Sequence, residues 1–257
     1  MKYTEKHDVT IVVPIKGQAD VRRFNKILRP SMDGIRGCKL LLITDEKIDP
    51  LPTEYLPIKV ISDKQFNIPE IGGWHKQQVL KIKSWSFVDT EWILTLDADC
   101  LFLFKGHINL LMPNNKPFLS WSGKLNGSQE EWWNKASKFL GKPKPEVRCG
   151  VTPMFLKRQV CKELDQTHDV CKYIQEGATE YSLYWVWGGD LKDYHRDNLV
   201  LPSDAYWNTG GNVIQQAKRI YHSAGRIGLV QSTSDKQEQW KGKDLLGKLI
   251  EIYKNRP

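Results

Sequence analysis

The first part of the sequence alternates short apolar, β-rich runs with segments of helical periodicity, and this alternation restricts the fold more than any other feature. Four runs are typical of strands: 9–14, which is a candidate for a buried strand, 39–44, 58–61 and 92–96. The segment 20–28 and the segment that opens at Gly72-Gly73 carry apolar residues at helical spacing instead. Strands that alternate with helices form βαβ units. We therefore expect an α/β fold with a mostly parallel central sheet flanked by helices.

After Asn109 the predicted elements become shorter and are separated by turn residues. We expect strands over 117–121, 150–156 and 219–222, and helices over 129–140, 157–164, 179–187 and 245–253. The last of these helices gathers apolar residues on one face. The sequence contains neither an internal repeat nor a long linker, so we expect a single domain over 1–257 with a nucleotide-type first half.

Composition excludes several classes of protein. Of the 257 residues, 40% are hydrophobic and 26% charged, which is the balance of an ordinary globular chain. The longest apolar run, 92–104, is interrupted by two aspartates and is shorter than the roughly 20 residues of a membrane-spanning helix. The first residues do not resemble a secretory signal, which predicts a cytoplasmic location, that of the host if the protein is viral. The five cysteines form no C-x-x-C pair and are expected to be mostly buried, reduced thiols.

Basic residues exceed acidic ones by 38 to 30, and the excess is concentrated near the end of the chain. Residues 215–257 contain nine basic and four acidic side chains. Such a segment suits an anionic partner, which could be nucleic acid, a phosphorylated substrate or an acidic membrane surface. The alternative is a solvated basic face with no partner.

Asp97 and Asp99 are the most informative residues for function. They interrupt the apolar run just where the strand 92–96 ends, and a buried charge without a partner is costly. Residues two apart in an extended chain project to the same side, so both carboxylates are able to face one cation. In open α/β sheets, ligands bind at the carboxyl ends of the strands. Hard divalent ions prefer oxygen ligands, which predicts a Mg²⁺ or Mn²⁺ site, although paired strand-end carboxylates are the structural alternative.

With this D-x-D triplet in place, the chain resembles the GT-A family of nucleotide-sugar-dependent glycosyltransferases. Gly73-Trp-His-Lys-Gln-Gln-Val-Leu-Lys81 is similar to the G-W-x-x-Q-Q-x-x-K helix of a subgroup of small GT-A-like transferases. The segments 150–155 and 179–184 resemble later motifs of that subgroup on the acceptor side, and the resemblance extends over most of residues 9–222. It implies a Rossmann-like donor half over about 9–109, an acceptor-side half over 110–237 and a basic amphipathic helix over 238–257.

The resemblance also implies a metal-dependent transfer of sugar from a nucleoside diphosphate sugar, most simply of UDP type. The metal, Mn²⁺ or Mg²⁺, would neutralise the diphosphate of the leaving group. Asp99 would be the direct ligand, and Asp97 would face either the metal or the ribose. Members of the family often recruit a late histidine as a further ligand, and His222 occupies the corresponding part of the chain; a surface histidine is the alternative.

Two segments supply further residues for binding the donor. The loop that begins at Pro14 follows the first strand, where a base and ribose would sit, and Lys16 is its positive charge. Gln78 and Lys81 are one turn apart on the predicted helix after Gly73 and would reach the diphosphate together. A solvated Lys81 is the structural alternative.

An inverting transfer needs a general base, and Glu180 and Asp190 are the two candidates. Glu180 matches the subgroup motif, but a Thr-Glu pair is also typical of the first turn of a helix. A retaining transfer would not require either residue as a base.

Aromatic residues gather in the second half of the sequence, and sugars and bases both stack on aromatic rings. Most of these rings are expected in the core. Trp132 and Trp133 are the pair least easily buried, and they are predicted to bind the acceptor together with Trp185. The acceptor would be a glycan hydroxyl or, because the chain is basic, a hydroxymethylated base in DNA.

Two functions of other classes remain as alternatives. A sugar-phosphate nucleotidyltransferase also combines an α/β nucleotide half with carboxylate-held Mg²⁺, but Pro14-Ile-Lys-Gly-Gln18 is a poor match to its glycine- and lysine-rich loop. A non-catalytic module would use the helix 245–253 to contact a membrane surface or a protein partner.

Overall fold

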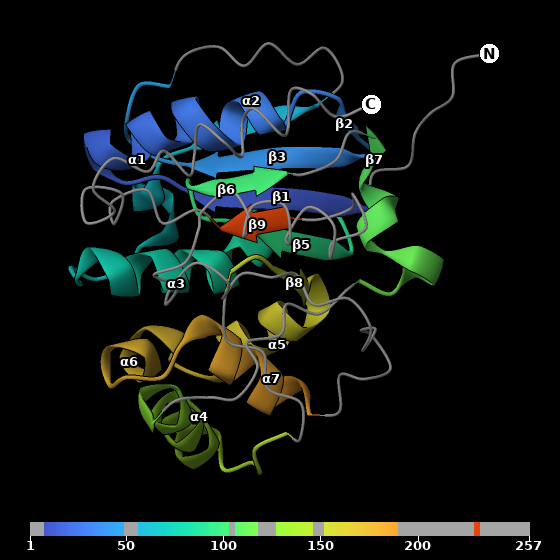
Figure 1. Cartoon of the computed structure of the whole chain (residues 1–257). Coiled ribbons are helices and arrows are strands. Elements are labelled where there is room, and N and C mark those ends of the chain that lie inside the picture. Colours follow the sequence, from blue (N-terminus) through green and yellow to red (C-terminus); the bar gives the residue numbers. More distant parts are fainter. Residues whose placement is uncertain are drawn as a thin grey trace.

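A five-stranded sheet forms the centre of the molecule (Figure 1). The structure is a computed structural model that describes residues 8–48, 56–102, 106–117, 127–145, 152–189 and 229–231. The strands lie in the order β4-β3-β1-β5-β8. Their bounds are β1 Val9–Pro14, β3 Cys38–Ile43, β4 Ile58–Ile61, β5 Trp92–Thr95 and β8 Met154–Lys157. The first four are parallel, and β8 pairs antiparallel with β5.

The register aligns the carboxyl ends of the parallel strands at one edge of the sheet. Pro14 lies opposite Ile43, Ile43 opposite Ile61, and Val12 opposite Thr95. The chain segments that leave these strands, including the one that carries Asp97, therefore begin close together at this carboxyl edge.

One face of the sheet is covered by a continuous helical segment near the N-terminus. It consists of α1 Gly17–Arg23, a π-helical turn Phe24–Leu28 and α2 Arg29–Ser31. Phe24 and Leu28 are completely buried and pack with Ile11 and Val13 of β1. The segment is longer at both ends than the helix predicted over 20–28, because the apolar residues mark only the turns that touch the sheet.

The opposite face is covered by a thicker layer of helices (Figure 1). Its members are α3 Gly73–Lys83, α4 Gly127–Leu140, α5 Arg158–Thr167, α6 Val170–Gln175 and α7 Glu180–Gly188. Val12 of β1 belongs to this second core, whereas its neighbours Ile11 and Val13 belong to the first. This alternation is the period-two pattern of a strand buried on both faces.

Shorter elements complete the described fold. Two small sheets pair β2 Ile35–Arg36 with β7 Gly106–His107 and β6 Cys100–Phe102 with β9 Leu229–Gln231. Single 3₁₀ turns cover Asp63–Phe66, Ser84–Ser86, Ile108–Leu111 and Pro113–Asn115. The β6–β9 pair is antiparallel and brings residues 229–231 next to the strand that follows Asp99.

The structure confirms the α/β class, the mostly parallel sheet and its cover of helices. The strand predicted over 150–156 is shorter, since β8 begins at Met154. Helix α6 was not predicted, because only its N-cap Asp169 and two buried residues mark it in the sequence. Cys38, Cys100 and Cys161 are buried thiols, as expected, and Cys171 is half-buried. The elements predicted over 219–222 and 245–253 and residues 118–121 lie outside the described residues. Of the basic segment 215–257, only residues 229–231 are described.

Candidate functional site

Lys81 forms the centre of a polar cluster at the carboxyl edge of the sheet. It lies in the last turns of α3, and only 4% of its side chain is exposed. Its ammonium group is 2.8 Å from Oδ1 of Asp97 and 3.2 Å from Oε1 of Glu180. It also donates to Oγ1 of Thr152 at 2.9 Å. The structural alternative, a solvated Lys81, is therefore wrong: Lys81 is a buried cation held between two carboxylates.

Asp97 and Asp99 lie on a turn directly after β5. The amide of Cys100 donates to the carbonyl of Asp97 at 3.0 Å, which closes this turn before β6 begins. Both aspartates are partly exposed, and the side chain of Asp97 is 27% exposed. The turn thus places one carboxylate against the buried Lys81 and a second carboxylate two residues further along the chain.

Glu180 is placed by the start of α7. Thr179 is the N-cap of this helix, and its hydroxyl accepts from the amide of Ser182 at 3.2 Å while the Ser182 hydroxyl accepts from the amide of Thr179 at 2.9 Å. This reciprocal capping fixes the first turn. Gln78 of α3 adds a contact, because its Oε1 accepts from the amide of Glu180 at 3.3 Å. Gln78 and Lys81 therefore both contact the start of α7, and their joint contact with a diphosphate stays a prediction.

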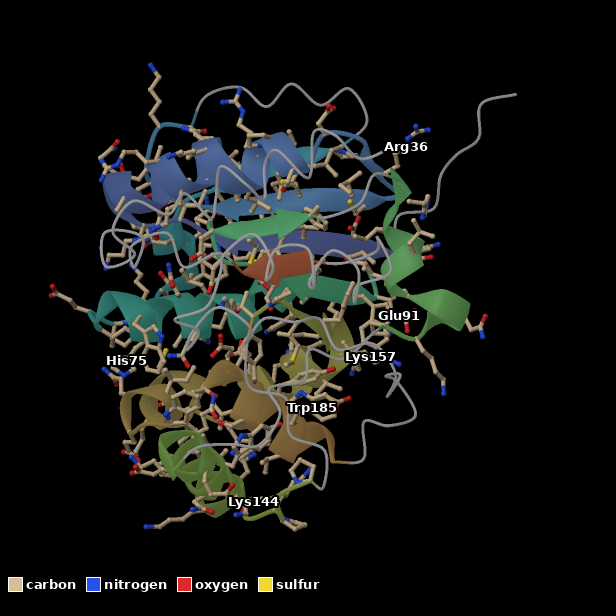
Figure 2. All side chains as sticks on the ribbon, viewed as in Figure 1. Arg36, His75, Glu91, Lys144, Lys157 and Trp185 are labelled. Carbon is tan, nitrogen blue, oxygen red and sulfur yellow. The ribbon has the colours of Figure 1, made fainter. Side chains whose placement is uncertain are left out.

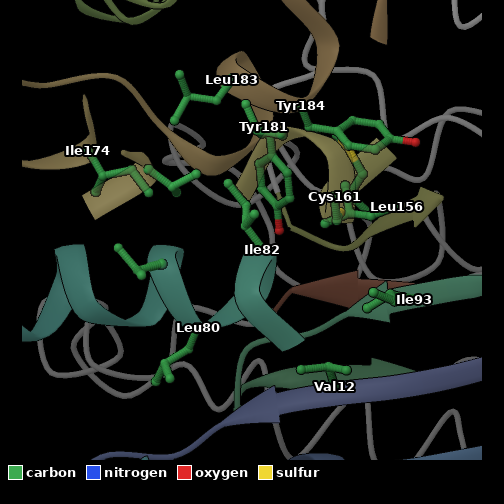
Figure 3. Packing of buried hydrophobic residues seen from close by; sticks show 14 of the residues in the cluster. Val12, Leu80, Ile82, Ile93, Leu156, Cys161, Ile174, Tyr181, Leu183 and Tyr184 are labelled. Atoms are coloured by element: carbon green, nitrogen blue, oxygen red, sulfur yellow. The ribbon is translucent and has the colours of Figure 1, made fainter. Parts of the chain in front are cut away.

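Three hydroxyl groups surround the cluster. The phenol of Tyr181 is hydrogen-bonded to Thr152 at 2.7 Å and to Thr95 at 3.0 Å, and the Thr95 hydroxyl donates to the carbonyl of Met154. Figure 3 shows the Tyr181 ring extending from α7 toward α3, whereas the Tyr184 ring points away. The network links α7 to β5 and to the residues just before β8.

The surroundings of the cluster raise the pKa values of both Lys81 and Glu180. Burial alone would lower the pKa of Lys81, but Asp97, Tyr181 and Glu180 together raise this pKa well above its ordinary value. Burial raises the pKa of Glu180, against the attraction of Lys81. Lys81 is therefore charged at neutral pH, and Glu180 is a weaker acid than a carboxyl group in water.

Cys100 follows the aspartate pair but does not add a reactive group to it. Burial, with the charges of Asp99 and Asp97, raises the pKa of its thiol well above the ordinary value. The thiol is completely buried and protonated at neutral pH, so it is not a nucleophile.

Asp20 forms a second polar group at the same edge of the sheet. Its carboxylate accepts from the amide of Lys16 at 3.0 Å, from Arg23 at 2.6 Å and from Gln77 of α3 at 3.2 Å. These bonds tie the loop after Pro14 to the helix that carries Lys81. A Cβ atom at Gly73 would lie 3.4 Å from Cδ and Nζ of Lys16, so this lysine packs on the first turn of α3.

The predicted aromatic residues separate into core and surface. Trp133 and Trp185 are each only 1% exposed and belong to the core, where the indole of Trp185 donates to the sulfur of Met154 (Figure 2). The prediction that they bind an acceptor is wrong, because the helical layer covers both rings. Trp132 is half-buried, and its ring centroid is 6.4 Å from that of Trp74. Trp74 is 54% exposed and was not singled out by the sequence, since helical periodicity does not show which face remains uncovered.

The carboxylates of Asp97 and Asp99 suit a divalent ion whose remaining ligands are phosphate oxygens and water. Within the described residues, no group of three or more His, Cys, Asp and Glu side chains is arranged to hold a metal. A pair of carboxylates is nevertheless what Mg²⁺ commonly uses when phosphate oxygens and water complete its shell. A carboxylate has about four lone-pair sites, so the bond from Lys81 leaves Asp97 capacity for an ion. His222 and Asp190 lie outside the described residues, and their roles stay predictions.

A hollow of about 460 Å³ lies away from this site. It is lined by residues of the amino ends of β1, β3 and β4 and of the turn before β5, including Thr10, Lys39, Ile58 and Asp89. Lys39 donates to both carboxylate oxygens of Asp89, so these charges are already paired. The carboxyl edge, with its buried lysine and exposed aspartates, is the better candidate for chemistry.

The fold and the site define an α/β protein with a charged cluster at the carboxyl edge of a mostly parallel sheet. Comparison with protein families adds one result: residues 2–243 match the family of unknown function DUF6492. The chain belongs to this family. None of the curated proteins matches the sequence. None of the helices in the described parts of the chain is long and apolar enough to span a membrane.

Proposed function

We propose that this protein is a glycosyltransferase that transfers a sugar from a nucleoside diphosphate sugar, of UDP type, to a hydroxyl acceptor with the help of Mn²⁺ or Mg²⁺. The observation that carries the proposal is the Asp97–Asp99 turn at the carboxyl edge of the sheet, with the buried Lys81 on one of its carboxylates. The resemblance of the D-x-D triplet and of the segment 73–81 to GT-A transferases supports the same function.

In this proposal Asp97 and Asp99 hold the metal ion. When bound, the ion neutralises charge that develops on the diphosphate leaving group. Lys81 contacts Oδ1 of Asp97 and so fixes the orientation of that carboxylate before any ligand arrives. Lys16, at the same edge of the sheet, supplies a positive charge beside the first turn of α3.

The structure changes the role that we assign to Glu180. Its side chain is 6% exposed and lies 3.2 Å from the ammonium group of Lys81. A general base must reach the acceptor hydroxyl, and a carboxylate enclosed in this way faces a lysine instead. We therefore assign Glu180 a positioning role through Lys81. Asp190, which follows Gly189 at the end of α7, stays the predicted base.

Isothermal titration of a panel of nucleoside diphosphates and nucleotide sugars tests the proposal. We expect one of these ligands to bind in the presence of Mn²⁺, and we expect binding to be lost when a chelator is added. Asp99→Asn should weaken binding by more than about tenfold, because changes to outer-shell groups alone typically cost about 10–100-fold in metal affinity. The matched control is Asp89→Asn, which removes a carboxylate that pairs with Lys39 away from the site.

Two results would contradict the proposal. One is the absence of metal-dependent binding for every nucleotide in the panel. The other is equal binding by Asp99→Asn and Asp89→Asn, with both variants shown to be folded by circular dichroism.

A further inference from the structure

The exposed Trp74 and the half-buried Trp132 form an aromatic pair that the proposed reaction has not used. Trp74 comes from the first turn of α3 and Trp132 from α4. Their rings meet at 47° with centroids 6.4 Å apart, and the imidazole of His75 stands edge-on to Trp74 at 5.1 Å. Figure 2 shows His75 at the outer end of α3. An indole that keeps 54% of its surface in water at such a junction is unusual, because large aromatic rings contribute most when they are buried.

Trp74 lies on the same side of α3 as two residues of the polar cluster. Trp74, Gln78 and Lys81 are spaced i, i+4 and i+7 along α3, so they share one side of the helix. Gln78 donates to the carbonyl of Trp74 at 3.5 Å and accepts from Glu180, while Lys81 contacts Asp97. At about 1.5 Å of rise per residue, Trp74 is about 10 Å along the helix axis from Lys81.

The surroundings of the pair suit a carbohydrate better than an apolar protein surface. The next residues along α3 are polar and bonded to other elements: Lys76 is paired with Asp63, and Gln77 is bonded to Asp20. Gly72 and Gly73 present only backbone, and a Cβ at Gly72 would lie 3.3 Å from Nδ1 of His75. The other exposed large apolar side chains of the described residues, Ile58, Val60 and Leu110, belong to other elements, β4 and the turn Ile108–Leu111.

We propose that Trp74 and Trp132 are a binding platform for an acceptor saccharide of more than one sugar unit. The apolar face of a pyranose ring stacks on an indole, and at a tryptophan that is 54% exposed the hydroxyl groups of the sugar keep their hydrogen bonds with water. A distance of about 10 Å to the cluster exceeds one sugar ring, so a ring on Trp74 and a ring near Asp97 belong to one oligosaccharide. The assignment rests on the proposed glycosyl transfer, because that reaction supplies the reason for an acceptor at this edge.

Screening on a glycan array, followed by titration of the bound oligosaccharides by NMR, tests the platform without metal or nucleotide. The array should include mono- to hexasaccharides of common hexoses, hexosamines, pentoses and uronic acids. We expect an oligosaccharide to bind and to shift the indole N–H resonance of Trp74, which is identified by its absence in Trp74→Phe. Trp74→Ala should weaken binding by about tenfold, which is the contribution of one stacked ring. Trp74→Phe should weaken it less.

Leu110→Ala is the matched control, because Leu110 is also a large apolar residue that is 44% exposed. Its affinity for saccharide should equal that of the native chain. Metal-dependent nucleotide binding should remain unchanged in Trp74→Ala, so a failure of the platform is distinguishable from a failure of the proposed transfer, which is tested at Asp99.

Four outcomes would overturn the platform. The first two are that no glycan binds and that Trp74→Ala binds as tightly as Leu110→Ala. The third is that hydroxymethylated DNA, and no saccharide, loses affinity in Trp74→Ala, which would assign the pair to nucleic acid. The fourth is that Trp74→Ala dissociates a dimer of the native chain in sedimentation, which would assign the pair to a protein interface.

Discussion

Lys81 is the residue on which the candidate site depends. A lysine almost never loses nearly all contact with water unless carboxylates compensate its charge. Here Asp97 and Glu180 provide that compensation from two different parts of the chain, and Thr152 and Tyr181 share the third N–H donor of Lys81. The arrangement is a buried ion cluster whose members are costly to remove one at a time.

We expect Lys81→Met to lower the free energy of unfolding by about 3 kcal/mol, because the change leaves the buried Glu180 without its positive partner. Urea denaturation followed by circular dichroism measures this quantity. Lys39→Met is the control, since Lys39 and Asp89 form an exposed pair, for which we expect a loss of less than about 1 kcal/mol. Equal losses in the two variants would show that the Lys81 cluster contributes no more than a surface ion pair.

Among the elements, α3 and α7 make the site, and each was predicted from a different signal. The segment 73–81 carries the pattern of an amphipathic helix, and Thr179 followed by Glu180 is typical of a helix start. The position of the aspartate pair after β5 was also predictable, because the apolar run stops there. The burial of the tryptophans was not predictable from the sequence. Trp132 and Trp133 are neighbours in sequence, and only the packing of α4 against α7 decides that Trp133 enters the core.

The N-cap of α7 offers a test of how this helix positions Glu180. Thr179→Ala removes the oxygen that accepts from the amide of Ser182, and we expect a loss of about 1 kcal/mol in the free energy of unfolding. Asp169→Ala removes the equivalent cap of α6, whose oxygen accepts from the amide of Lys172. Both variants should lose stability, but only Thr179→Ala should weaken Mn²⁺-dependent nucleotide binding in calorimetry. Equal binding by the two variants would contradict a positioning role for the start of α7.

The stability of the chain as a whole should respond to the titration of Glu180. Its pKa is raised in the folded state from the ordinary value of 4.5. At a pH between the unfolded-state pKa of Glu180 and its higher folded-state pKa, the folded chain retains a proton that the unfolded chain has released. The contribution of Glu180 to stability therefore falls as the pH rises through this range. In Glu180→Gln the titration is absent. We therefore expect the melting temperature of this variant, relative to that of the native chain, to rise as the pH increases above 4.5.

The control for this pH series is Glu163→Gln, which removes an exposed carboxylate of α5. Thermal unfolding of the three proteins at a series of pH values provides the comparison. If Glu180→Gln differs from the native chain by the same amount at every pH, as a mere change in packing would produce, the titration of Glu180 does not contribute to stability.

The pairing of β6 with β9 has a consequence for folding during synthesis on the ribosome. β6 begins at Cys100, directly after the aspartate pair, and Cys100 lies opposite Gln231 in the antiparallel register. Asp97 and Asp99 leave the ribosome long before β9 does, because about 130 residues separate them in the sequence. Contacts between such distant parts of a chain form late in folding. The strand that leaves the aspartate turn therefore waits for its partner until nearly all of the sequence has been synthesised.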